Sequence, residues 1–370
     1  MQQRVIISQD IEHDLAQAIA ETEHDRVFVL TDDITQECCL PKVAALLTKH
    51  NATTITIHHD DTNKTLATLA DVWTALQRGG ATRHSLLVNL GGGMVTDLGG
   101  FAAATFKRGI NFINIPTTLL AMVDAAVGGK TGINFGGLKN EVGAFANARY
   151  VIVNTCFLDT LDTANLCSGY AEMLKHSLIS NAQMWAEHVN FDILQPDLAE
   201  LQRMVAASIA VKEHIVADDP HEHGIRKALN FGHTIGHALE EFSMQQPGGA
   251  VVSARLLPLA RARTAPKNTL LHGYAVAFGL IGELYISARK AGFPTARLHQ
   301  TTRFIRENYG AVAFTCDDSP TLLNLMRHDK KNTSDTINFT LLHDIGDIRI
   351  NQTATDEEIR EALDFIREGY

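Results

Sequence analysis

Residues 85–100 read SLLVNLGGGMVTDLGG, and they decide the fold of the first half of the chain. The apolar run SLLVNL predicts a buried strand, and the glycines at 91–93 turn the chain into the helix that we expect next. Such a turn lets backbone amides approach a pyrophosphate, and the helix N-terminus adds donors and a favourable dipole. The pattern differs from G-x-G-x-x-G, so a tight turn without a ligand is the alternative.

Similar apolar runs flank this turn on both sides. Further strands are predicted by the β-branched runs at 26–32, 54–59, 111–116 and 150–154. Helical patterns at 38–50 and 66–79 lie between them. Strands that are apolar on both faces and alternate with helices indicate a parallel sheet covered on both sides. We therefore expect an α/β, Rossmann-like dinucleotide-binding domain over residues 1–160.

From about residue 165, helical periodicity replaces the strand signal. Helices are predicted by the patterns at 169–180, 198–217, 227–242, 273–291 and 356–369, and a short hairpin by the alternation at 336–351. We expect a mostly α-helical, metal-binding domain over residues 161–370. An insertion at about 244–270 carries three prolines and the basic residues Arg255, Arg261, Arg263 and Lys267. We expect a surface loop there, with a basic lid or subunit contact as the alternative.

Composition excludes several classes of protein. The 370 residues carry a formal net charge of −10, which argues against a nucleic-acid partner. The five cysteines form no C-x-x-C pair, which favours a reducing compartment over a disulfide framework or a thiolate zinc site. No apolar run approaches the roughly 18–20 residues that a membrane span needs, and the N-terminus lacks the apolar core of a signal peptide. We expect a cytoplasmic enzyme with no membrane partner.

Two further segments carry chemistry. Residues 116–140 are rich in Gly, Thr, Lys and Asn, and Lys130 and Lys139 there are suited to an anion; the alternative is a flexible surface loop. His233 and His237 share one face of a predicted helix. With a carboxylate such as Glu172 and a further histidine such as His272 on other helices, they could supply a catalytic Zn²⁺ site that keeps an open position. The H-E-x-x-H motif is absent, and chance spacings are expected among 17 histidines.

Six motifs, taken together, resemble the 3-dehydroquinate synthase family of sugar-phosphate cyclases. They occur in the family's order and span about residues 30 to 340. They are GGGMVTDLGGFAAATFKRGINFINIPTTLLAMVDAAVGGKTGIN (91–134), LKNEVGAF (138–145), GYAEMLKH (169–176), GIRKALNFGHTIGHALE (224–240), LLHGYAVAFG (270–279) and MRHDKKN (326–332). The resemblance implies a dehydroquinate synthase-like fold that uses NAD and a divalent metal.

Site residues carry over from this resemblance motif by motif. The implied ligands of Zn²⁺, for which Co²⁺ could substitute, are Glu172, His233 and His272, while His237 moves to the substrate phosphate. Catalytic roles are implied for Glu222, His237 and Lys130. Implied substrate contacts are Arg108, Asp124, Lys130, Lys139, Asn140, Lys175, Lys212, Arg226, Asn230, His237, Lys330 and Lys331. Implied NAD contacts are Asp32, Asp61, Lys64, Gly92, Gly93, Met94, Val95, Asp97, Thr117, Thr118, Phe157 and Thr160. Arg108 matches a residue that reaches a neighbouring subunit's site, so the resemblance also implies a homodimer.

The implied reaction converts 3-deoxy-D-arabino-heptulosonate 7-phosphate to 3-dehydroquinate and phosphate, the second step of the shikimate pathway. Lys212 and Arg226 favour this substrate because a planar guanidinium suits bidentate recognition of a carboxylate. The alternatives are a cyclase of the amino-dehydroquinate or inosose type, a metal-dependent polyol dehydrogenase of the same fold, and an inactive binding protein. The chain departs from the family pattern at Ile34, at Ala125–Ala126 and in the long segment between His233 and His272.

Overall fold

The protein divides into two compact units. The structure is a computed structural model that describes residues 3–245, 251–252, 269–328 and 336–368. Unit 1 comprises Met1–Leu161 and Asp197–Ile209, and unit 2 comprises Asp162–Pro196 and Ala210–Tyr370. Helix α8 (Leu198–Asp218) therefore contributes residues to both units.

Unit 1 is built on a six-stranded sheet in which every strand pair is parallel. The strand order is β1 (Arg4–Ile7), β8 (Tyr150–Val153), β5 (Asn111–Pro116), β4 (Leu86–Gly91), β2 (Val27–Asp32) and β3 (Thr53–Ile57). The four central strands β8, β5, β4 and β2 are almost fully buried, which is why their sequences read as unbroken apolar runs. The predicted parallel sheet is confirmed. Strand β1 was not predicted, because this short edge strand is half-exposed.

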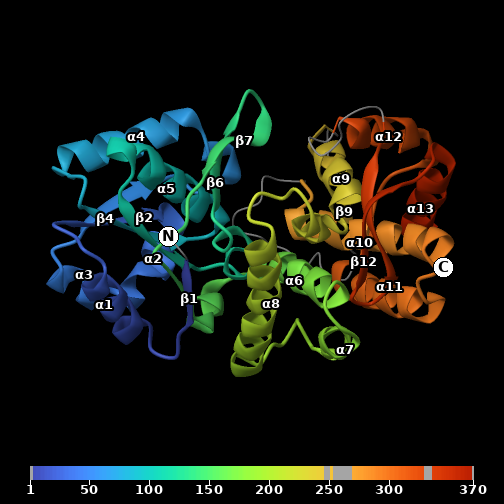
Figure 1. The fold of residues 1–370 in the computed structure, drawn as a ribbon, viewed down its shortest axis with the longest axis horizontal. Coiled ribbons are helices and arrows are strands. Elements are labelled where there is room, and N and C mark those ends of the chain that lie inside the picture. Colours follow the sequence, from blue (N-terminus) through green and yellow to red (C-terminus); the bar gives the residue numbers. More distant parts are fainter. Residues whose placement is uncertain (1–2, 246–250, 253–268, 329–335, 369–370) are drawn as a thin grey trace. The chain divides into compact units, whose positions relative to one another are not determined.

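Helices cover both faces of this sheet. They are α1 (Ile11–Glu21), α2 (Asp33–Cys38), α3 (Ala44–Lys49), α4 (Leu66–Arg78) and α5 (Gly93–Thr105). Figure 1 shows α4 and α5 on one side of the strands and α1 and α3 on the other. This is the arrangement that right-handed crossovers give for the observed strand order. The prediction of one helix over 38–50 is wrong. Pro41 cannot donate a backbone hydrogen bond to the preceding turn, so the helix is interrupted there by a separate 3-10 turn, Leu40–Lys42.

The segment predicted to bind an anion, residues 116–140, has more structure than expected. A π-helical turn, Ala121–Ala125, leads to the antiparallel hairpin of β6 (Lys130–Phe135) and β7 (Leu138–Phe145). Gly136 and Gly137 form its turn with φ angles of 59° and 83°, which glycine adopts without steric cost. The alternative of a flexible loop is therefore wrong for this segment.

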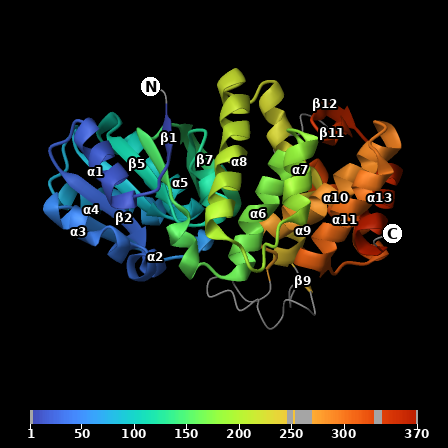
Figure 2. The same ribbon diagram turned by 90° about the horizontal axis from the view of Figure 1, so that it is seen from below.

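Unit 2 is a helical bundle around α10 (His272–Lys290). The other helices are α6 (Thr163–Leu178), α7 (Ala182–Asn190), α9 (His233–Gln245), α11 (Thr295–Tyr309), α12 (Ser319–Arg327) and α13 (Asp356–Glu368). Helices α6, α9, α11 and α13 all pack on α10, and Figures 1 and 2 both show α11 and α13 beside it. A hairpin of β11 (Asn338–Asp344) and β12 (Asp347–Thr353) completes the unit, together with the short pair β9 (Val251–Val252) and β10 (Ala311–Val312).

Two expectations for this unit need comment. The pattern at 227–242 was predicted as one helix, but a 3-10 helix (η6, Ile225–Asn230) ends before Gly232, whose φ of 82° interrupts the helix and lets α9 begin at His233. Most of the predicted insertion at 244–270, including its four basic residues, lies outside the described residues. No helix among the described residues is both long enough and apolar enough to cross a membrane.

Candidate functional site

Three helices of unit 2 bring one carboxylate and two imidazoles together. Glu172 on α6 is fully buried, and its Oε1 lies 3.3 Å from Nε2 of His233 and 3.5 Å from Nε2 of His272. These residues form one of the groups in the described chain whose geometry could hold a metal ion. Oε1 has no hydrogen-bond partner of acceptable geometry although it is buried, which is unusual for a carboxylate oxygen. A divalent cation between the three side chains would satisfy it.

Hydrogen bonds to the other ring nitrogens aim both histidines at Glu172. Nδ1 of His272 lies 2.9 Å from the Glu240 carboxylate, and Nδ1 of His233 lies 3.2 Å from the carbonyl oxygen of Phe231. A proton held on Nδ1 leaves the Nε2 lone pair for a metal. Two imidazoles and a carboxylate are a donor set of catalytic Zn²⁺ sites. The residues therefore fit a divalent metal.

Glycines allow the three helices to approach closely enough to form this group. A Cβ atom at Gly273 would lie 1.8 Å from the backbone oxygen of Ser168 on α6. One at Gly279 would lie 1.9 Å from the oxygen of Gly232, directly before α9. One at Gly236 would lie 3.0 Å from the oxygen of Ala275 on α10. Only glycine allows backbones to come this close, so these positions fix the separation of the ligands.

Without a bound metal, electrostatics keep the carboxylate ionised and favour the protonated form of His272, a proton that metal binding would displace. Burial raises the pKa of Glu172, but the Lys175 ammonium and His233 outweigh it and hold the pKa well below its usual range. Burial also lowers the pKa of His272, yet Glu240 and Glu172 raise it to about 10. Lys175, predicted as a substrate contact, forms an ion pair with Oε2 of Glu172 one helical turn away. An ionised carboxylate is the form that binds a metal.

His237 lies beside this group without belonging to it. Its ring centroid is 5.2 Å from that of His233 and 5.9 Å from that of His272. The ligand group of the described chain contains the other two histidines and excludes this one. Its position next to the group is compatible with the expected role at the substrate rather than at the metal.

The residues before α9 form a second cluster in unit 2. Asn230 donates from Nδ2 to Oε1 of Glu222 over 2.6 Å, which joins a predicted substrate contact to a predicted acid–base residue. Asp219 accepts hydrogen bonds from three backbone amides, those of His223, Gly224 and Arg226, and so fixes this turn. Asp219 was not predicted, since nothing distinguishes it in the sequence from a surface aspartate.

The three predicted carboxylate-binding cations are buried. Lys175, Lys212 and Arg226 are exposed by 1%, 6% and 2%. Surface lysines and arginines keep their charged ends in water, so burial of all three is unexpected for a scattered surface arrangement. Lys330 and Lys331 lie outside the described residues.

In unit 1, the predicted NAD contacts follow the carboxyl ends of the parallel strands. Gly92 is the N-cap of α5, and no side chain caps this helix end, which leaves its amides available to an anion. Thr117 follows β5 and donates its amide to Gly91, while a Cβ on Gly92 would lie 3.0 Å from Thr118 Cγ2. The other predicted contacts lie at or just after strand ends, or at the start of α5. Asp32 ends β2, Asp61 follows β3, and Phe157 and Thr160 follow β8. Met94 and Val95 lie in the first turn of α5. This edge of a parallel sheet is where such folds bind dinucleotides, so the residues fit NAD.

A buried lysine links predicted NAD and substrate contacts in the same unit. The Lys64 ammonium lies 3.1 Å from Asp97, 3.4 Å from Asp61 and 2.6 Å from the Asn140 side-chain oxygen. Lys139 lies 3.5 Å from the other oxygen of Asp61. Asp61, Asp97 and Asn140, which come from separate segments of the sequence, therefore meet around Lys64.

Other predicted residues of unit 1 stand on different elements. Lys130 begins β6 with an exposed side chain, and Asp124 lies on the π-helical turn. Arg108 is exposed on the turn after α5 with a φ of 70°. The expected convergence of Lys130 and Lys139 with the cations of unit 2 stays a prediction.

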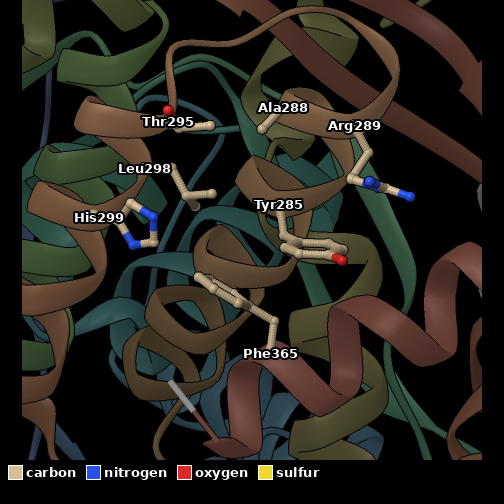
Figure 3. Close-up of a pocket in the computed structure, with 7 residues that line it drawn as sticks. All are labelled: Tyr285, Ala288, Arg289, Thr295, Leu298, His299 and Phe365. Carbon is tan, nitrogen blue, oxygen red and sulfur yellow. The ribbon is translucent and has the colours of Figure 1, made fainter. Parts of the chain in front are cut away.

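A surface pocket of about 550 Å³ in unit 2 shares no residue with these groups. It is lined by Tyr285, Ala288, Arg289, Thr295, Leu298, His299 and Phe365 (Figure 3). The rings of Tyr285 and Phe365 stack there with centroids 4.9 Å apart. No residue predicted for metal, cofactor or substrate lines this pocket, so it is not part of the candidate site.

Comparison with known proteins identifies the family of this chain. The family models "3-dehydroquinate synthase N-terminal" and "3-dehydroquinate synthase C-terminal" match residues 54–168 and residues 169–257 and 260–332. A 3-dehydroquinate synthase from Parabacteroides distasonis is 50% identical over 369 residues, which cover 100% of this chain and 99% of that protein. The chain belongs to the 3-dehydroquinate synthase family.

Solved structures agree with this assignment at the level of the fold. A 2-deoxy-scyllo-inosose synthase complexed with carbaglucose-6-phosphate, NAD⁺ and Co²⁺ superimposes with a TM-score of 0.81 at 22% identity, covering 100% of this chain and 96% of that one. A 2-epi-5-epi-valiolone synthase from Streptomyces hygroscopicus with NAD⁺ and Zn²⁺ bound gives 0.80 at 24%, covering 100% and 98%. The family resemblance, the enzyme class and the dehydroquinate synthase-like fold expected from the sequence are confirmed.

Proposed function

We propose that this chain is a 3-dehydroquinate synthase that releases phosphate from 3-deoxy-D-arabino-heptulosonate 7-phosphate with catalytic NAD and a divalent metal. The observation that carries the proposal is the Glu172, His233 and His272 group, set in a chain that is 50% identical to a 3-dehydroquinate synthase. The metal is Zn²⁺ or Co²⁺. The enzyme is cytoplasmic and belongs to the shikimate pathway of aromatic amino acid biosynthesis.

The two cofactors supply chemistry that side chains lack. When bound, NAD⁺ would supply reversible hydride transfer at the carbon that bears a substrate hydroxyl, and the metal would supply Lewis acidity to substrate oxygens. Gly92, Gly93 and the first amides of α5 would hold the pyrophosphate, with Lys64 and Asp97 as further NAD contacts. Glu172, His233 and His272 would hold the metal.

The chain's own residues bind the substrate and move its protons. Lys175, Lys212 and Arg226 take the carboxylate, and all three are buried residues of unit 2. Lys130, Asn140, Asn230 and His237 take the phosphate. Glu222 acts in proton transfer, and the amide of Asn230, 2.6 Å from its Oε1, holds this carboxylate in place.

The enzyme acts as a homodimer in which Arg108 serves the partner's phosphate site. Its exposure on the turn after α5 supports this role. The β6–β7 hairpin also exposes four large apolar side chains: Phe135, Leu138, Val142 and Phe145 are 53%, 52%, 39% and 58% exposed. Apolar groups gathered in this way are typical of protein contacts. Sedimentation at micromolar concentration should give a dimer, and Phe135→Ser together with Phe145→Ser should give monomers.

The decisive assay is phosphate release from the heptulosonate phosphate, with NAD and Zn²⁺ each added and withheld. We expect release only when both are present, with no accumulation of NADH. NADH formation without phosphate would identify a polyol dehydrogenase instead. Arg226→Ala should abolish turnover of this substrate; turnover of a sugar phosphate without a carboxylate by the wild type would favour an inosose-type cyclase.

The metal assignment has a matched control within the chain. Asp33, His58 and His59 form another His and Asp group, which is exposed in unit 1, where His59 already pairs with Asp33 over 2.6 Å. We expect His233→Ala to abolish tight Zn²⁺ binding and phosphate release, and His59→Ala to leave both unchanged. The reverse pattern would show that the metal binds elsewhere.

A further inference from the structure

Glu283 is a fully buried carboxylate near the middle of helix α10, and it is the one charged residue of that helix between His272 and Arg289. No motif of the sequence analysis includes it. Its two oxygens face the start of α9: Oε2 accepts a hydrogen bond from the amide of Gly232 over 2.7 Å, and Oε1 accepts from Thr234 over 2.9 Å and Ile235 over 3.3 Å. A charged side chain is buried at such a place only when it is well paired.

These three amides are the ones that a helix cannot pair within itself. The first four amides of an α-helix have no intrahelical acceptor, and a carboxylate at this end also complements the helix dipole. The first residue of α9 is His233. Gly232, just before it, has a φ of 82°, and a Cβ there would lie 2.7 Å from Leu280 on α10. The backbone that carries His233 is thus held to α10 by Glu283 on one side and by close packing on the other.

The arrangement is reciprocal. Helix α9 contributes Glu240, which orients His272, the first residue of α10. Helix α10 contributes Glu283, which fixes the first turn of α9 and with it His233. Each helix therefore supplies a carboxylate that holds the N-terminal histidine of the other. Neither carboxylate belongs to the group that could hold the metal.

We propose that Glu283 is a positioning residue that fixes His233 for metal binding by capping the first turn of α9 from the neighbouring helix. The inference rests on the proposed function, because it takes Glu172, His233 and His272 as the metal site. Loss of an outer-shell partner typically lowers metal affinity 10- to 100-fold. Because Glu283 acts through backbone, its loss should weaken Zn²⁺ binding within that range.

The test compares Glu283→Gln with wild type in metal binding and in the absorption spectrum of bound Co²⁺. A glutamine keeps the size of the side chain but has one acceptor oxygen in place of two. Its NH2 group must then face a backbone N–H at the start of α9, which places two donors against each other. We expect a dissociation constant for Zn²⁺, measured against a competing chelator, that is at least tenfold higher, and a shifted Co²⁺ spectrum. Glu283→Asp, which keeps both oxygens on a shorter chain, should recover part of the affinity.

Ser287→Ala is the matched control. Ser287 lies one turn further along α10, is also fully buried, and accepts a hydrogen bond from Leu342 over 3.0 Å. Its loss should lower the melting temperature and leave the affinity for Zn²⁺ within twofold of wild type. The proposal is overturned if Glu283→Gln binds Zn²⁺ like wild type. It is also overturned if Ser287→Ala lowers the melting temperature by the same amount as Glu283→Gln and loses as much affinity for Zn²⁺.

Two additions keep the result decisive. If Glu283→Gln does not fold, hydrogen exchange of the metal-free wild type takes its place: protected amides of Gly232, Thr234 and Ile235 are expected, and fast exchange there overturns the proposal. Glu172→Gln is measured in parallel. If that variant binds Zn²⁺ like wild type, the metal site of the proposed function is wrong, whereas a failure confined to the Glu283 variants leaves the proposed function intact.

Discussion

Replacing Lys64 with methionine should destabilise unit 1 far more than removing a neighbouring surface lysine. Only 5% of the Lys64 side chain is exposed, and its ammonium contacts Asp97, Asp61 and Asn140. Burial lowers the pKa of Lys64, but Asp97 and Asp61 outweigh it and raise the pKa above its usual value. The group is therefore charged at neutral pH, and methionine leaves two carboxylates without their buried counter-ion.

The magnitude follows from the exposure of the partners. Breaking a fully buried pair costs about 3–5 kcal/mol. Asp97 and Asp61 are 17% and 41% exposed, so water screens them in part, and we expect a loss near 3 kcal/mol in the free energy of unfolding. Lys139 is the control: it is 46% exposed and lies 3.5 Å from Asp61, so Lys139→Met should cost less than about 1 kcal/mol.

The assay is urea unfolding of the NAD-free, metal-free protein. The chain has two tryptophans, Trp73 on α4 in unit 1 and Trp185 on α7 in unit 2, so a Trp185→Phe background makes fluorescence report unit 1. Adding Asp97→Asn to Lys64→Met should recover part of the loss, because it removes one uncompensated charge. Equal losses for Lys64→Met and Lys139→Met, or a further loss in the double variant, would refute the reasoning.

Three more predictions concern unit 2. Glu240→Gln should weaken Zn²⁺ binding about 10- to 100-fold in chelator competition, because His272 loses the partner that fixes its ring; unchanged affinity would exclude that role. Gly273→Ala should cost about 3 kcal/mol or more in calorimetry and lower metal occupancy, because its Cβ would lie 1.8 Å from the Ser168 oxygen; wild-type stability would contradict the packing argument. Backbone amides hold the pKa of Asp219 below its usual value despite some burial, so this carboxylate stabilises the fold above about pH 4 and loses that effect as pH falls further. Asp219→Asn should therefore be less stable than wild type at pH 6 in urea unfolding of metal-free protein, with a gap that narrows as the pH falls below about 4, and a constant gap would exclude a titrating carboxylate.

The sequence predicted those parts of the fold whose burial is uniform. Strands β2, β4, β5 and β8 have apolar residues on both faces, so their runs are visible without any knowledge of their neighbours. Strand β1 is half-exposed and carries no such signal. The β6–β7 hairpin was missed because its chemistry-bearing Lys, Asn and Gly residues suggested a loop, although the glycine pair at 136–137 is itself a hairpin signal.

Residue types at the candidate site could be predicted, but their supports could not. The resemblance assigns a role to Glu172, His233 and His272, whereas Glu240, the last residue of the 224–240 motif, reads as one more charge on an amphipathic helix. Helical periodicity does not tell a buried carboxylate from a solvated one. Glu283 did leave a signal, since it is the sole charged residue between His272 and Arg289 in a stretch of apolar and small residues. A lone charge in an apolar helix needs a buried partner, and that partner here is the start of α9.

The charges inside unit 2 are hard to explain by stability alone. Glu172, Lys175, Arg226, Glu240 and Glu283 are all less than 9% exposed within a helical core that could have been apolar. Taking such groups out of water is costly, and replacing buried ion pairs with apolar residues is often neutral or stabilising. Perturbed and buried ionisable groups gather where a site needs them. The glycines of α10 bring the same helices into backbone contact, so close packing and buried charge converge on the two histidines, and the cost is best understood as that of holding a metal site in place.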